Sequence, residues 1–190
     1  MRFKELIEEE MTDAQLALYR EMRDGPRAGI RGPLKVLLHN PDLARCAAMM
    51  GEYVRWKSSL PARISEFAIL VAARCWTSQF EWVAHYPLAM KAGVAPAVAA
   101  QLAMGQRPDG MQADEEAAYQ FCTEAHTERK VSDATFAMAK AQFGTTGVVD
   151  LLGLCGYYCM VSMVLNVNDG ELPAGVAPPL PIIEKIAETQ

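Results

Sequence analysis

The stretch from Glu66 to His85 constrains the fold of this chain more than any other part of the sequence. After Glu66 it is almost entirely apolar or small, and this run breaks near Thr77 before the sequence turns apolar again. A long apolar run without strict alternation predicts a helix that is buried on most sides. The break predicts that a second helix starts directly afterwards. The sequence therefore places two consecutive helices at the centre of the fold.

One face of the second helix carries chemically active side chains. Four residues recur at i, i+3, i+4 and i+7, the spacing that puts side chains on one side of an α-helix: Ser78, Glu81, Trp82 and His85. An acid, a hydroxyl and an imidazole beside an indole are suited to acid–base chemistry. Two other interpretations stay open. Ser78 and Glu81 also fit a capping box, in which each side chain bonds an amide of the first turn, and His85 also fits a satisfied core histidine.

Composition points to a single helical domain. The chain has 190 residues, of which 51% are hydrophobic and 22% charged, so it is long enough to bury a substantial core. Abundant Ala and Met with few alternating β-branched residues favours helix, and we expect an all-α fold of about seven or eight helices. A net charge of −5 argues against general nucleic-acid binding. An anionic ligand would need a local Arg or Lys.

The sequence divides the chain into three segments. Residues 1–32 read as an N-terminal helix and loop arm, residues 33–167 as the helical domain, and residues 168–190 as an extended proline-rich tail. The longest run almost free of charge, Leu151–Leu165, spans about fifteen residues, whereas a bilayer-spanning helix needs about 20. We therefore expect a central core or oligomer helix with no membrane role.

Two arginines are candidates for holding a ligand carboxylate. Arg55 lies on a helix with aromatic neighbours, a setting that suits either a carboxylate or a subunit interface. Arg74 stands alone in the apolar run and needs an acidic partner if it is buried. Pairing of Arg74 with Glu66 or Glu81 would be structural, and pairing with a ligand carboxylate would be functional.

The five cysteines indicate reduced thiols. Their number is odd, no Cys-x-x-Cys motif occurs, and no secretory signal precedes them, which favours a cytoplasmic location. Cys155 and Cys159 are one turn apart on an apolar helix, a placement that fits packing better than redox work. The sequence shows no zinc-binding spacing, and neither a metal nor a cofactor is expected.

The spacing of the central residues resembles that of a known family. Glu66, Ser78 twelve residues later, then Glu81 and His85 resemble the carboxymuconolactone decarboxylase family and its AhpD-like alkylhydroperoxidase relatives. In the peroxidase branch, cysteines stand where this chain has Ser78 and Glu81. The run Phe80–His85 resembles the decarboxylase-like branch instead. Further similar stretches are Leu38–Ala44, Leu60–Glu66 and Leu88–Gly93, and the resemblance covers about residues 33 to 166.

The resemblance implies a helical homo-oligomer, a trimer or hexamer in many relatives, and a cofactor-free enzyme. Its substrate would be a small anionic compound, a carboxylated lactone or aromatic ring-cleavage product, and the reaction decarboxylation or a related isomerisation or hydrolysis. A non-catalytic helical oligomer that acts as a binding protein is the alternative. Hydroperoxide reduction is disfavoured because the dithiol is missing.

Each candidate residue has an expected role. His85 is the proton donor or acceptor, Glu66 orients it or charges it, and Glu81 is a second acid. Trp82 forms a wall of the pocket and Ser78 donates a hydrogen bond. Arg55 or Arg74 holds the carboxylate of the substrate.

Overall fold

All the regular structure in the described part of the chain is helical. A computed structural model describes residues 1–24 and 29–182. The elements are a short 3₁₀ turn, η1 (Glu8–Glu10), and the helices α1 (Asp13–Asp24), α2 (Pro33–Leu37), α3 (Pro41–Trp56), α4 (Ala62–Cys75), α5 (Gln79–Ala92), α6 (Pro96–Ala103), α7 (Ala113–Thr127) and α8 (Asp133–Asn168). The predicted all-α class, and the predicted number of helices, are confirmed for these residues.

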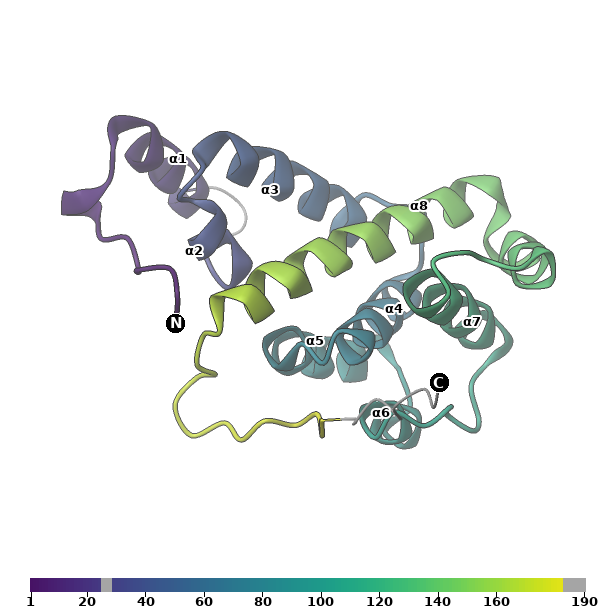
Figure 1. Cartoon of the computed structure of the whole chain (residues 1–190). Coiled ribbons are helices and arrows are strands. Elements are labelled where there is room, and N and C mark those ends of the chain that lie inside the picture. The colour runs from purple at the N-terminus through teal and green to yellow at the C-terminus, as the bar shows by residue number, and fades with distance from the viewer. Residues whose placement is uncertain (25–28, 183–190) are drawn as a thin grey trace, which may run out of the picture.

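Helix α4 is the centre of the molecule, as its sequence predicts. Every residue from Phe67 to Arg74 is buried. The helix packs against α5, α7, α8 and α6, and Figure 1 shows it surrounded by these neighbours. A helix that is apolar all round has no wet face, so it is stable only when other helices cover it.

Helix α8 crosses the whole molecule beside α4 and α3 (Figure 1). It bends at Gly144, whose φ of 66° and ψ of 179° are not helical. The sequence predicts a helix end at this glycine, because glycine commonly follows the last turn of a helix, and the bend agrees with it. By length and composition alone α8 could span a membrane, but half of its most apolar 18-residue window is buried inside this chain. The buried half of this window belongs to the core of this fold.

The sequence also predicts an N-cap at Asn40 and a helix end at Gly93, and the structure has helix ends at both residues. The Asn40 side chain accepts a hydrogen bond from the Leu43 amide at 3.1 Å, directly before the proline that opens α3. Gly93 ends α5 with a left-handed φ of 100°, the conformation that glycine adopts most easily. Local sequence therefore determines where α3 begins and where α5 ends.

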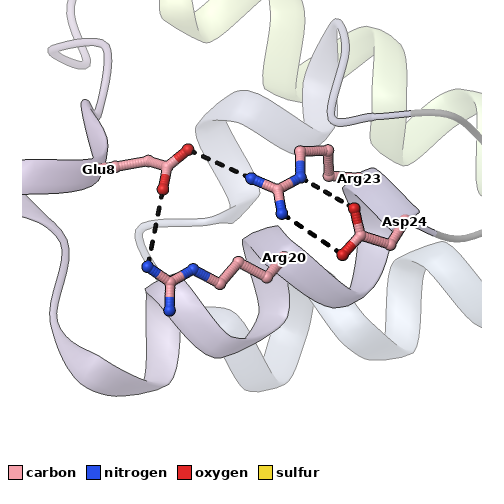
Figure 2. Close-up of polar contacts among 4 residues, drawn as sticks. All are labelled: Glu8, Arg20, Arg23 and Asp24. Carbon is pink, nitrogen blue, oxygen red and sulfur yellow. Dashed lines mark hydrogen bonds and ion pairs between the residues drawn. The ribbon is translucent and has the colours of Figure 1, made fainter.

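The N-terminal segment forms a second, smaller core with α2 and α3. Leu18 and Met22 of α1 are buried against this group, whose other members are Leu34, Leu37, Leu38, Ala44, Ala47 and Ala48. Ion pairs lie on the exposed side of α1. In Figure 2 the Glu8 carboxylate pairs with the guanidinium groups of Arg20, at 3.9 Å, and Arg23, at 3.6 Å. Such exposed pairs contribute little, so the buried leucine and methionine hold α1 in place.

The C-terminal segment folds back onto its own chain. From Asp169 onward it runs below α5 toward α6 (Figure 1). Gln79 exchanges two hydrogen bonds with the backbone of Leu180, at 2.7 and 2.9 Å, and the Leu180 side chain enters the main core. An amphipathic turn expected at residues 182–187 lies outside the described residues, apart from its first position.

Candidate active site

The turn between α4 and α5 brings Glu66 and His85 together. Thr77 takes a positive φ of 47°, and α5 then runs back along α4. This reversal places His85, nineteen residues after Glu66, so that its Nδ1 lies 2.7 Å from Glu66 Oε2. Glu66, whose side chain is 15% exposed, keeps this centre in contact with solvent, whereas His85 is buried.

A tyrosine and a second acid face the other nitrogen of His85. Its Nε2 lies 3.3 Å from the Tyr158 hydroxyl and 3.5 Å from Glu81 Oε2. The Tyr158 ring packs edge-on against the imidazole, with 5.2 Å between the ring centroids. Tyr158 comes from α8 and was not predicted, because it lies 73 residues beyond His85 inside a uniformly apolar run.

Burial controls the charge of the two groups near Nε2. It raises the pKa of Glu81, and the charge of Glu66 adds to this effect while His85 and Arg55 oppose it. Burial also raises the pKa of Tyr158 well above its ordinary value. Both groups therefore favour their protonated forms, which can donate to Nε2, while the Glu66 carboxylate accepts from Nδ1–H. This arrangement selects the imidazole tautomer with its proton on Nδ1.

The capping box, which the sequence left open as an alternative role for Ser78 and Glu81, is not formed. Ser78 is the N-cap of α5, but its side chain makes no capping hydrogen bond, and its Oγ is buried without a partner among the described residues. The Glu81 side chain extends along the helix toward His85 and does not bond back to the Ser78 amide. Glu81 thus contacts His85 and does not cap the helix. The helix face that carries Ser78, Glu81 and His85 is buried in the protein.

Arg55 lies within electrostatic range of Glu81 and Tyr158. It lies near the end of α3, and its guanidinium carbon stands 4.7 Å from the centre of the Trp56 ring. Its charge acts on both Glu81 and Tyr158, lowering the pKa of each. Its Nε is buried without a hydrogen-bond partner among the described residues. Arg55 thus supplies positive charge beside the centre.

The prediction that Arg74 pairs with an acid was wrong. Its Nη1 donates to the carbonyl oxygens of Ala103 and Pro181, at 3.1 and 2.9 Å, and its Nη2 donates to Thr77 Oγ1 at 2.7 Å. Burial lowers the pKa of this arginine. Backbone carbonyls from distant segments replace the expected carboxylate, so Arg74 fastens the C-terminal segment to α4 and α6.

Two hollows border α5, the helix that carries Glu81 and His85. Neither hollow is lined by Glu66, Glu81 or His85. Trp82 forms a wall of an apolar hollow of about 360 Å³, together with Val83, Tyr86, Ala99, Ala100, Ala103 and Pro179. A larger hollow of about 880 Å³ lies between the N-terminal segment, α2, the start of α5 and the end of α8. Within residues 1–24 and 29–182, no three His, Cys, Asp or Glu side chains are arranged to hold a metal ion.

Comparisons with known proteins support the fold alone. No protein-family model matches the sequence, and no curated protein matches it. Among solved structures, the chain is similar to one from Ralstonia eutropha JMP134 described as an alkylhydroperoxidase AhpD core, an uncharacterized peroxidase-related protein. The TM-score is 0.70 over 87% of this chain and 88% of the other, at 16% sequence identity. This protein thus has an AhpD-like helical fold.

Proposed function

We propose that this protein is a cofactor-free acid–base enzyme that acts on a small carboxylated lactone or a related ring-cleavage acid. One observation carries the proposal. A buried imidazole has a carboxylate on one nitrogen, at 2.7 Å, and two groups that favour their protonated forms near the other, at 3.3 and 3.5 Å. Carboxyl groups in such different environments suit separate acid and base roles.

In the proposed reaction His85 moves a proton at Nε2. Glu66 holds the Nδ1 proton and stabilises the imidazolium that forms when Nε2 takes up a second proton. Glu81 is close enough to Nε2 to exchange a proton with it, and burial favours its neutral acid form. The pair is therefore suited to give a proton to a carbon atom next to a carbonyl group.

Decarboxylation is the reaction that best uses this arrangement. Breaking the bond to the departing carboxylate releases CO₂ and pushes its electron pair into the conjugated lactone carbonyl. Hydrogen-bond donors would stabilise the developing oxyanion, and the Ser78 hydroxyl, which has no partner among the described residues, is a candidate. His85 then protonates carbon. Isomerisation or hydrolysis of a related acid would need the same proton transfer.

Arg55 is the proposed partner of the carboxylate that the substrate retains. Its charge already acts on Glu81 and Tyr158, and its guanidinium lies over the Trp56 ring. A planar guanidinium binds a carboxylate through two parallel hydrogen bonds. Arg74, in contrast, already uses both of its terminal nitrogens within the chain.

We also propose that the protein is a cytoplasmic homo-oligomer, in which one face of α3 and α8 is covered by another copy. Large apolar side chains on this face remain exposed at helical spacing: Met49, Tyr53 and Trp56 on α3, and Val149, Leu152 and Met163 on α8. The two helices contact each other and lie side by side in Figure 1. Several large exposed apolar side chains on two neighbouring helices are typical of a protein–protein interface. Trimers and hexamers are the expected sizes, and a light-scattering mass of one chain at micromolar concentration would contradict the proposal.

A non-catalytic binding protein is the second candidate function. It is favoured by the finding that neither hollow described above reaches Glu66, Glu81 or His85. Hydroperoxide reduction at this centre is disfavoured, because Ser78 and Glu81 cannot form a disulfide.

A panel of carboxylated lactones and dienoic acids distinguishes these functions. Each compound is incubated with the purified protein, and ultraviolet absorbance and CO₂ release are followed together. CO₂ release with a change in absorbance supports decarboxylation. A change in absorbance without CO₂ supports isomerisation or hydrolysis. Saturable binding without turnover of any compound would favour the binding protein and contradict the enzyme.

A further inference from the structure

The larger of the two hollows is built from segments that are far apart in the sequence. Its lining comes from the N-terminal segment, α2, the first residues of α5 and the end of α8, and its volume is about 880 Å³. The N-terminal end lies beside the end of α8 (Figure 1), where the amides of Arg2 and Phe3 both donate to Asn168, at 2.7 and 3.0 Å. Ligand pockets commonly have volumes of about 300–1,000 Å³, so this hollow is large enough for a small organic ligand.

Each of these segments contributes an apolar side chain to the lining. Phe3 belongs to the N-terminal segment, Val36 to α2, Phe80 to α5 and Leu165 to α8. Phe3 remains 40% exposed, so its ring is available to an apolar ligand. Phe80 lies against the backbone of Gly32, where a β-carbon would come within 2.6 Å of the ring. The glycine therefore leaves space for the Phe80 ring in the wall of the hollow.

Three charged side chains of the lining have no ion-pair partner within residues 1–24 and 29–182. Arg31 lies just before α2, and Asp169 and Glu171 lie just after α8. All three are exposed. They line one hollow without pairing with each other, although their charges are opposite. The two signs of charge thus come from different walls, the cation from the side of α2 and the acids from the end of α8.

The other charged side chains of the lining already have partners. Lys35 pairs with the Glu5 carboxylate, and Lys4 lies 2.7 Å from a carboxylate oxygen of Glu10. Each of these pairs is neutral as a whole. A ligand in the hollow therefore meets one unpaired cation and two unpaired acids.

A matching ligand carries a carboxylate and an ammonium group at the two ends of an apolar body. A guanidinium binds a carboxylate through two parallel hydrogen bonds, which suits Arg31. An ammonium group suits the two acids, and the negative end of the α8 dipole beside Asp169 favours it further. An extended peptide spans about 3.3–3.6 Å per residue, so three residues span about 10 Å, the width of a hollow of this volume.

We propose that this hollow binds a short apolar peptide of about three residues with both ends free. Its terminal carboxylate pairs with Arg31, and its terminal ammonium group pairs with Asp169 and Glu171. Its apolar side chains pack against Phe3 and Phe80. The inference does not rest on the proposed acid–base function, because the hollow is not lined by the residues of the His85 centre.

The test measures how three forms of the tripeptide Leu-Ala-Phe bind to the full-length protein, by isothermal titration calorimetry. One form has both ends free, one is acetylated at its N-terminus, and one is amidated at its C-terminus. We expect saturable binding of the free form, with one peptide per chain. Blocking either end should weaken binding by at least about threefold, because each block removes a charge that is paired in the complex.

Variants of the protein assign each end of the peptide to its wall. Arg31→Gln should weaken binding of the free form and remove the difference between the free and amidated forms, but keep the difference between the free and acetylated forms. The double variant Asp169→Asn with Glu171→Gln should do the reverse. Asparagine tolerates the positive φ of 52° at position 169, so this variant preserves the end of α8.

A matched control is Lys140→Gln, which removes an exposed cation of α8 outside the lining and should bind all three forms as the wild type does. Circular dichroism establishes that each variant is folded. Absence of saturable binding of the free form, or equal binding of all three forms by the wild type, would overturn the proposal. So would decanoate, an apolar carboxylate without an amino group, if it bound more tightly than the free peptide and kept its affinity in the double variant.

Discussion

Replacing Arg74 tests the assignment of this buried cation to a structural role. The change Arg74→Met keeps the length of the side chain and its apolar contacts but removes all of its donors. The carbonyl oxygens of Ala103 and Pro181 then lose their partner, as does the Thr77 hydroxyl. We therefore expect the C-terminal segment to detach from α4 and α6 before the core unfolds.

The size of the effect follows from these contacts. Hydrogen bonds to a charged group contribute about 1.5–3 kcal/mol each, so three such bonds set an upper limit of roughly 4.5–9 kcal/mol. Two terms reduce it, because the variant no longer buries a cation and because the freed Pro181 carbonyl can turn to water. We expect a net loss of about 2–4 kcal/mol in the free energy of unfolding. For a chain of this size the melting temperature falls by roughly 5–15 °C.

Urea unfolding followed by circular dichroism measures this loss. Arg74→Lys is the matched control: it keeps the charge but cannot bridge three acceptors, so it should lose most of the same stability. A double-mutant cycle with Glu66→Gln should show additive effects, within about 0.5 kcal/mol, because the two side chains share no contact. A coupling free energy above about 1 kcal/mol would show that Arg74 interacts with Glu66, as the sequence suggested, and would refute the structural assignment.

Three further predictions concern buried polar groups. Burial raises the pKa of Glu81, so the folded protein keeps the Glu81 proton at pH values above the ordinary glutamate pKa of about 4.3. The stability of the wild type relative to Glu81→Gln should therefore fall as the pH rises above about 4.3. A difference in the free energy of unfolding that stays constant with pH in urea would contradict this. Hydrogen bonds from Ser59 and Tyr53 lower the pKa of Asp150 by more than burial raises it. Asp150→Asn should therefore lower the free energy of unfolding by about 2–4 kcal/mol at neutral pH, and by less in acid, where the wild-type carboxylate is protonated. A loss that grows in acid would contradict this direction. Ser78→Ala should change the free energy of unfolding by less than about 0.5 kcal/mol, since Ser78 caps nothing, whereas loss of a working cap costs about 1 kcal/mol.

Local signals predicted the framework of the fold well. The apolar run before Thr77 and the change of period after it located α4 and α5, and Asn40, Gly93 and Gly144 marked helix ends where the structure has them. These features depend on residues within one or two turns of each other. Such information is present in a short stretch of sequence, so no knowledge of tertiary packing was needed.

The contacts that sequence reasoning missed are all long-range. The helical period correctly placed Glu81 and His85 on one buried face, but it carries no information about Tyr158, which reaches His85 from α8. The carbonyl partners of Arg74 come from the end of α6 and from the C-terminal segment, and a backbone oxygen leaves no trace in the sequence. From the sequence, Glu81 was ambiguous between a capping residue and a candidate site residue. In the structure it forms no cap and lies buried beside His85.

The most direct test of the account is the turnover of the His85→Gln variant on a compound that the wild-type protein converts. The proposal assigns the proton transfer to His85, so kcat should fall by about 10²–10⁴-fold. Circular dichroism and the melting temperature serve to show that the variant remains folded. Phe136→Leu, which alters an exposed aromatic ring near the start of α8, is a suitable comparison for general effects of substitution. Full turnover by a folded His85→Gln variant would contradict the central claim.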